Sequence, residues 1–116
     1  MRKAMLILAV TLAGWAAQQM PAPRLQALGT EPFWSIEIGN GQLRYSSPDV
    51  LDGIAFPADE TPLGKGWRFS GTLQGKPVIL VVEPAACNDG MSDMVYPYTA
   101  RFTWGERTDQ GCARRK

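Results

Sequence analysis

Hydrophobic and polar residues alternate along several short stretches of the chain, which is the pattern of a half-buried β-strand. Residues 33–38, 42–46, 67–73 and 98–104 alternate in this way, and residues 78–82 form a continuous aliphatic run. Turn-forming residues separate these stretches about every ten positions, and no helical period follows the N-terminal segment. The pattern therefore predicts an all-β fold, a small antiparallel β-barrel or sandwich of six to eight short strands.

The turns and breaks suggest how these strands are connected. Gly39-Asn40-Gly41 indicates a hairpin between the first two alternating stretches. Residues 50–56 could add a short strand, and residues 57–66, rich in proline, glycine and acidic residues, favour a surface loop. The aliphatic run at 78–82 suits a central strand covered on both faces, and we expect Pro84 to end it.

The N-terminal segment predicts export. Arg2 and Lys3 precede an apolar run at residues 4–13 that only Thr11 interrupts, and Ala16 follows. This run is shorter than the roughly 20 residues of a membrane-spanning helix, so a signal peptide at 1–16 is favoured over an uncleaved anchor. We expect a flexible, proline-containing leader at 17–28, one β domain at 29–113 and a solvated basic tail at 114–116. The protein would then be periplasmic or secreted, with no transmembrane segment in the mature chain.

The charge balance and the cysteines narrow the picture further. Removing residues 1–16 leaves ten basic and eleven acidic residues, a net charge of −1, without the basic patch that nucleic-acid binding requires. We expect a monomer. Two cysteines in an exported chain, Cys87 and Cys112, predict one disulfide. Two free thiols or a thiolate metal site are the alternatives, but the latter lacks a histidine and a third cysteine.

Catalytic signatures are missing from the sequence. The absence of histidine excludes Ser-His-Asp and Cys-His catalysis together with the usual zinc sites. No glycine-rich loop leads into a helix, so a phosphate-binding loop is unsupported. We therefore predict no enzyme, no metal and no cofactor.

The segment that begins at Cys87 holds most of the candidate site residues. Asn88, Asp89, Ser92 and Asp93 place many oxygen atoms within six positions. They could recognise a partner or ligand, bind calcium, or form a general acid/base pair from the two aspartates. The alternative is structural, with Asp89-Gly90 forming the turn while Asp93 or Ser92 caps local amides. Tyr96 follows as a core or rim aromatic, or as a ligand platform.

Glu31 and Trp34 form a second group of candidates. Phe33 and Trp34 are adjacent, so in a strand they face opposite sides. One should enter the core, while the other covers a sheet face or lines a groove. Glu31 is either solvated or paired with an arginine such as Arg101 or Arg68.

Five segments resemble a family of small, uncharacterised bacterial envelope proteins, some of them lipoprotein-like. They are GTEPFW (residues 29–34), LRYSSP (43–48), CNDGMSD (87–93), YPYTA (96–100) and GCA (111–113). Modules of that family sometimes occur beside META domains and C-type lysozyme-inhibitor domains. The resemblance implies an envelope location, a small β domain and a Cys87–Cys112 disulfide. Unlike the lipoprotein-like members, this chain has no cysteine at the signal cleavage site.

These observations favour an exported, non-enzymatic binding or envelope-maintenance module that uses residues 87–100 to contact an envelope protein or a small ligand. A secreted inhibitor of a hydrolase such as lysozyme is the alternative hypothesis. A third hypothesis is an enzyme acting on envelope glycans through Asp89 and Asp93.

Overall fold

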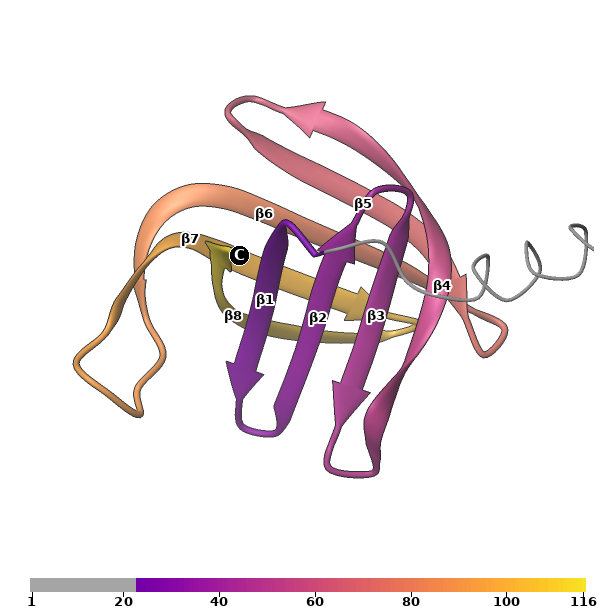
Figure 1. The fold of residues 1–116 in the computed structure, drawn as a ribbon, viewed down its shortest axis with the longest axis horizontal. Coiled ribbons are helices and arrows are strands. Elements are labelled where there is room, and N and C mark those ends of the chain that lie inside the picture. Colours follow the sequence, from indigo (N-terminus) through magenta and orange to yellow (C-terminus); the bar gives the residue numbers. More distant parts are fainter. Residues whose placement is uncertain (1–22) are drawn as a thin grey trace, which may run out of the picture.

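The computed structural model describes residues 23–116, which form a closed antiparallel β-barrel (Figure 1). Its eight strands are β1 (Leu25–Thr30), β2 (Phe33–Gly39), β3 (Gln42–Ser47), β4 (Val50–Leu63), β5 (Gly66–Leu73), β6 (Lys76–Asn88), β7 (Val95–Trp104) and β8 (Arg107–Arg115). Each strand pairs with the next one along the chain, and β1 pairs with β8 to close the barrel. The predicted all-β fold is confirmed, and closure makes it a barrel.

One hydrophobic core fills the barrel. Along each strand every second side chain points inward, so Val78, Leu80 and Val82 of β6 are buried. The residues between them, Ile79 and Val81, are partly exposed on the outer face. The prediction that residues 78–82 are covered on both faces is therefore wrong, because nothing in the described structure packs against the outside of β6.

Two strands run through segments that composition had marked as breaks. The predicted loop at 57–66 is wrong, because β4 continues to Leu63 and pairs with β3 through Pro57 and then with β5 from Ala58. This part of β4 is mostly exposed, which accounts for its polar composition. Pro84 does not end β6 either. It pairs with Tyr98, and the register shifts between Pro84 and Cys87.

The chain ends of the barrel also differ from expectation. β1 starts at Leu25, so the last four residues of the predicted flexible leader form a strand. The predicted solvated tail is largely in β8, and Lys116 bonds to Glu37 through its Nζ atom at 2.9 Å. Barrel closure needs both segments, because each supplies the pairing partner of the other. The predicted signal peptide at 1–16 and the leader at 17–22 lie outside the described residues.

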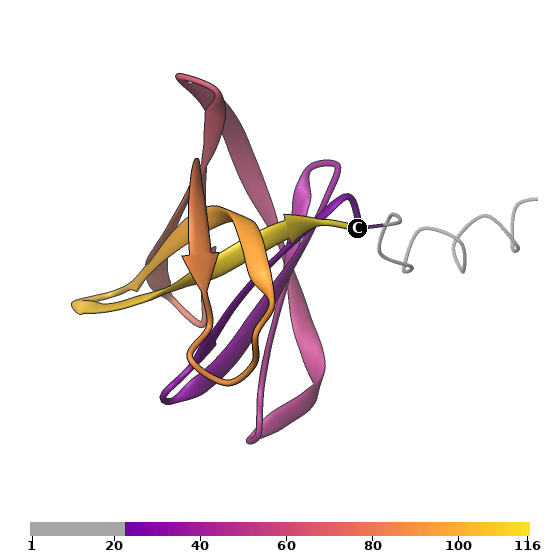
Figure 2. The same cartoon turned by 90° about the vertical axis from the view of Figure 1, so that its left-hand side faces the viewer.

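Figure 2 shows the barrel turned by 90°, with the connection between β6 and β7 in front of it. This connection projects from the barrel, as the orange segment in both views shows. No helix within residues 23–116 is long and apolar enough to cross a membrane.

Candidate functional site

A disulfide fixes the segment that the sequence singled out. Cys87 near the end of β6 is bonded to Cys112 of β8, with the Cα atoms 5.5 Å apart, which confirms the predicted bridge. Ala113 faces the core, so its neighbour Cys112 points to the outer face of β8. Cys112 is nevertheless only 1% exposed. The predicted segment from Cys87 to Ala100 is here called the Cys87 loop, although its last six residues belong to β7. The disulfide thus fastens the start of the loop to the outside of the barrel.

Asp89 organises the interior of the Cys87 loop. Its Oδ1 atom accepts hydrogen bonds from the backbone N–H groups of Met91 and Ser92 at 2.9 and 3.1 Å. Its Oδ2 atom accepts one from the hydroxyl of Tyr96 at 3.1 Å. Gly90, which lies between Asp89 and Met91, has a positive φ of 78°, a conformation that glycine adopts without strain. The turn expected at Asp89-Gly90 is present, and Asp89 caps two of the loop amides.

Asn88 and Ser92 complete this network. Asn88 accepts a hydrogen bond from the N–H of Gly90 through Oδ1 at 2.7 Å and donates one through Nδ2 to the carbonyl of Ser92 at 3.1 Å. Ser92 accepts a hydrogen bond through Oγ from the N–H of Met94 at 3.2 Å, as expected for a capping residue. Asp93 is exposed and forms no hydrogen bond or ion pair with the described part of the chain. The two aspartates therefore differ sharply in their surroundings.

Hydrogen bonding shifts the acid–base properties of two loop residues. The N–H of Met91, more than any other group, lowers the pKa of Asp89, because it stabilises the ionised carboxylate. Burial, followed by the hydrogen bond to Asp89, raises the pKa of Tyr96. A general acid that works near neutral pH needs a raised carboxyl pKa, so the direction at Asp89 disfavours that role. No group of three or more candidate metal ligands occurs within residues 23–116.

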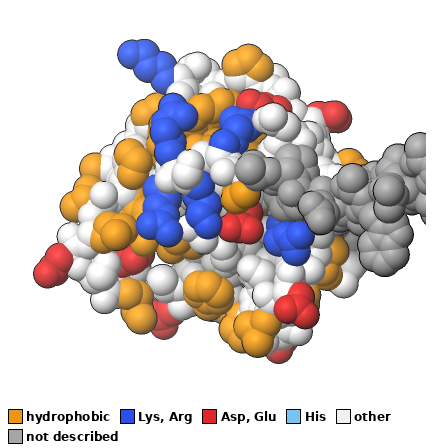
Figure 3. Space-filling model, in the orientation of Figure 1, with side chains coloured by type: hydrophobic (Ala, Val, Ile, Leu, Met, Phe, Trp, Pro, Cys, Tyr) orange, Lys and Arg blue, Asp and Glu red, His pale blue; other side chains and the backbone are white. Residues whose placement is uncertain are grey.

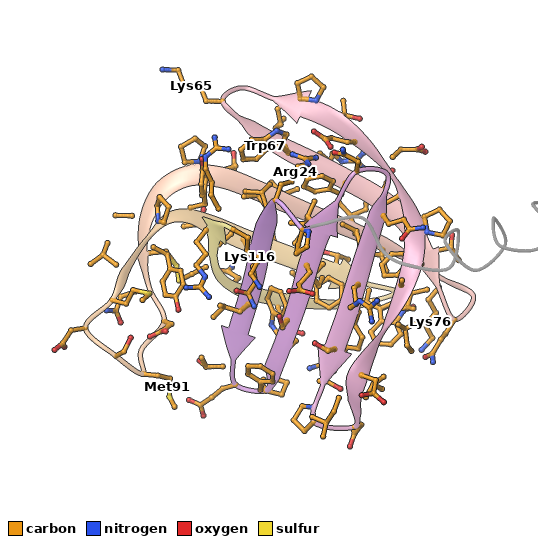
Figure 4. All side chains as sticks on the ribbon, in the orientation of Figure 1. Arg24, Lys65, Trp67, Lys76, Met91 and Lys116 are labelled. Atoms are coloured by element: carbon orange, nitrogen blue, oxygen red, sulfur yellow. A yellow bond between two sulfur atoms is a disulfide. The ribbon has the colours of Figure 1, made fainter. Side chains whose placement is uncertain are left out.

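The tip of the Cys87 loop exposes apolar side chains that sequence reasoning did not single out. Met91, Met94 and Val95 are 74%, 48% and 66% exposed. Figure 4 shows Met91 at the end of the loop, pointing away from the barrel. The signal available in the sequence was the position of two methionines and a valine beside turn-forming residues.

A cavity of about 270 Å³ lies at the base of the Cys87 loop, where the loop meets β1 and β8. Asn88 and Asp89 line it from the loop, and Leu28 and Thr30 line it from β1. Thr30 donates a hydrogen bond through Oγ1 to the backbone carbonyl of Asp89 at 3.2 Å, which ties the loop to the end of β1. Together with the disulfide, this bond holds the loop at two points.

Trp34 and Glu31 lie apart from the loop residues. Trp34 is 2% exposed inside the barrel, whereas Phe33 is 49% exposed, as the alternation predicted. A Cβ atom on Gly29 would lie 2.1 Å from Trp34 Nε1, so the missing side chain of Gly29 makes room for the indole ring. Glu31 is exposed in the turn between β1 and β2 and takes part in none of the ion pairs of the described residues. The suggested pairing with Arg101 or Arg68 is not found.

Basic side chains gather where β1 meets β8, a cluster that the balanced composition concealed. Figure 3 shows several lysine and arginine side chains together on this face. Pairing of β1 with β8 brings four basic residues to one end of the seam between these two strands: Arg24, Arg114, Arg115 and Lys116. Each has a partner within the barrel, as Arg24 pairs with Glu60 and Arg115 stacks over Trp67 at 5.6 Å from the ring centroid. The cluster is thus built into the seam.

The fold and site define a small, disulfide-bonded eight-stranded antiparallel barrel that carries one projecting, internally hydrogen-bonded loop. Comparison of the chain with protein-family models, with curated proteins and with solved structures found no match.

Proposed function

We propose that this protein is an exported, non-enzymatic binding module of the cell envelope, and that the Cys87 loop contacts a protein partner. The observation that carries the proposal is a loop held rigid from within whose tip exposes Met91, Met94 and Val95. Adjacent exposed apolar side chains on a small domain are typical of an interaction surface. The predicted signal peptide and the disulfide support an extracytoplasmic location.

The energetics favour the loop tip as the contact. Binding normally costs about 0.5–1.5 kcal/mol for each flexible side chain that becomes ordered, and further energy for each loop that does. The Asp89 network and the disulfide reduce the second cost, because the backbone is already fixed. Full burial of a methionine or valine side chain contributes about 1.5–3 kcal/mol. We therefore expect the partner to hold an apolar pocket that accepts the side chains at the tip of the loop.

The test is a binding measurement with a matched control. Purified protein and its Met91→Ser/Met94→Ser variant are used to capture partners from envelope extract, and the captured protein is then purified and titrated. The control is Leu63→Ser, which removes an apolar side chain that is 40% exposed on another part of the barrel. Loss of two buried methionines should weaken binding about a hundredfold or more. Equal affinity of the tip variant and wild type would contradict the proposal.

Inhibition of a hydrolase is a second candidate function. The loop projects as one narrow element from the barrel (Figures 1 and 2), a shape suited to insertion into a concave active site. The check is a lysozyme activity assay with the oxidised protein. Absence of any effect at micromolar concentration would exclude lysozyme as the target, whereas inhibition lost in the tip variant would identify the loop as the inhibitory element.

A further inference from the structure

A second cavity, of about 210 Å³, opens at the end of the barrel near the turns that join β1 to β2 and β3 to β4. Five aromatic side chains line it: Phe33, Trp34, Tyr45, Phe102 and Trp104. The centroids of Trp34 and Phe102 are 5.1 Å apart, and those of Tyr45 and Trp104 are 5.2 Å apart. The mouth of a β-barrel is a usual place for a ligand, and an aromatic wall is the usual lining.

The rings around this cavity are held in place by the barrel. Trp104 donates a hydrogen bond through Nε1 to the carbonyl of Leu73 at 3.1 Å. Trp34 lies over Gly29 and Gly111, where a Cβ atom on Gly111 would come within 3.1 Å of its Cζ2 atom. The cavity therefore has a defined shape before any ligand binds, which lowers the cost of binding.

The polar lining of the cavity consists of an ion pair, Arg107 with Asp109, together with Ser47 and the exposed Asp49. Arg107 Nε lies 3.0 Å from Asp109 Oδ2 in an ion pair, and the two side chains are 55% and 18% exposed. Both line the cavity. Within residues 23–116 these two side chains form no hydrogen bond, so the terminal amino groups of Arg107 can donate one to a ligand and Asp109 Oδ1 can accept one. The pair as a whole is electrically neutral.

The charge and size of the cavity define the ligand class. An anionic ligand would be repelled by Asp49 and Asp109. A cation would gain little from Asp49, which is exposed, and would compete with Arg107 for Asp109, whose side chain is only 18% exposed. A neutral molecule with hydroxyl groups satisfies donor and acceptor together. Since a cavity of about 150 Å³ holds benzene, 210 Å³ has room for one six-membered ring with substituents. We propose that the cavity binds one sugar ring of a neutral glycan, with its C–H face against the aromatic wall and its hydroxyls on Arg107 and Asp109.

A polar groove adjoins the cavity and could bind further sugars of the same glycan. The groove has a volume of about 650 Å³ and lies on the outer face of β1 to β3, the face turned toward the viewer in Figure 3. Its polar lining consists of Gln26, Ser35, Glu37, Arg44, Ser46 and Asp52. Phe33 lines both the groove and the cavity, and its exposed ring lies where a second sugar would pass from one to the other. The groove thus extends the site to a short oligosaccharide.

The experiment is ligand-observed NMR with the purified oxidised protein and a panel of neutral mono- and trisaccharides, up to about 10 mM, a range that detects millimolar affinities. Benzoate, choline and a neutral tripeptide complete the panel. At least one neutral sugar should bind saturably, quench the emission of Trp34 or Trp104, and bind more tightly as the trimer. Binding of no sugar, or of the charged probes or the tripeptide in preference to every sugar, would overturn the proposal.

Three variants locate the site. Asp109→Asn removes the counter-charge of Arg107 and should weaken sugar binding at least tenfold. Phe33→Ala, at an exposed position that does not support the core, removes part of the cavity wall and should weaken binding of the monosaccharide, and binding of the trimer more strongly, by about tenfold. Met91→Ser, in the Cys87 loop, should have no effect, so failure here and failure of the proposed loop function are distinguishable. Sugar binding that survives both cavity variants, with circular dichroism showing that they are folded, would refute the assignment.

Discussion

Removing the Cys87–Cys112 disulfide should destabilise the barrel by an amount that the length of the closed loop predicts. The cysteines are 25 residues apart. Without the cross-link, the extra entropy of a loop of this length lowers the free energy of the unfolded chain, and therefore the stability of the fold, by about 3.5 kcal/mol at 25 °C. A domain of about 90 residues unfolds with an entropy near 0.2 kcal/mol/K, so the midpoint of thermal unfolding should fall by about 18 °C. A loss of about 3.5 kcal/mol is a large share of the free energy of unfolding of a typical folded domain, which is about 5–15 kcal/mol.

The assay is urea unfolding followed by tryptophan fluorescence, on oxidised protein, on reduced wild type and on Cys87→Ala/Cys112→Ala. Reduced wild type keeps both side chains, so it isolates the effect of the cross-link. The double variant adds the loss of packing at Cys112, which is 1% exposed. The urea dependence of the free energy should be steeper without the bridge, because the unfolded chain is more expanded. A loss below about 1 kcal/mol in reduced wild type would refute the loop-closure reasoning.

The remaining predictions concern the core and the loop. Gly111→Ala should lower the thermal midpoint sharply in a melting experiment, because its Cβ atom would lie 1.9 Å from the backbone oxygen of Leu28. Leu80→Ala should cost about 2–5 kcal/mol in urea unfolding, since Leu80 is fully buried. The pKa of Asp89 is lowered in the folded protein, so its stabilisation of the loop should be complete above the ordinary aspartate pKa of about 3.9. It should be lost as the pH falls through the lowered pKa, as an NMR titration of the loop amides would show. Tyr96→Phe should move that titration to higher pH, because it removes one of the hydrogen bonds that lower the pKa. An unchanged titration in Tyr96→Phe would contradict the role given to this bond.

The strands were predictable from alternation, but the closure of the barrel was not. Closure depends on pairing between residues 25–28 of β1 and residues 112–115 of β8. In the sequence, residues 25–28 and 114–116 are short, partly polar segments, so they were predicted to be a leader and a tail. Their strand character comes from partners at the opposite end of the chain, which local pattern cannot reveal. The same holds for β4, whose polar half becomes a strand only by pairing with β5.

The candidate site also has a part that could be predicted from the sequence and a part that could not. The turn at Asp89-Gly90 and the capping of nearby amides are local, so composition and spacing could predict them, although the capping was assigned to Asp93 or Ser92 and not to Asp89. The aromatic cavity draws Trp34 from β2, Tyr45 from β3 and Phe102 from β7. Residues so far apart in sequence are brought together by strand order and register alone. Trp34 was recognised as a candidate because of its alternation with Phe33, but its neighbours in the cavity could not be.

The pairing of β1 with β8 also has a consequence for the folding pathway. The barrel closes through contacts between Leu25 and Arg115, the most distant pairing in the sheet. Joining chain segments about 90 residues apart costs on the order of 4 kcal/mol of entropy before those contacts form. Until residues 112–115 pair with it, β1 has one edge without a neighbouring strand, and a strand of another chain can pair with that edge. We therefore expect a high contact order and folding in milliseconds to seconds, with seam closure as a late step.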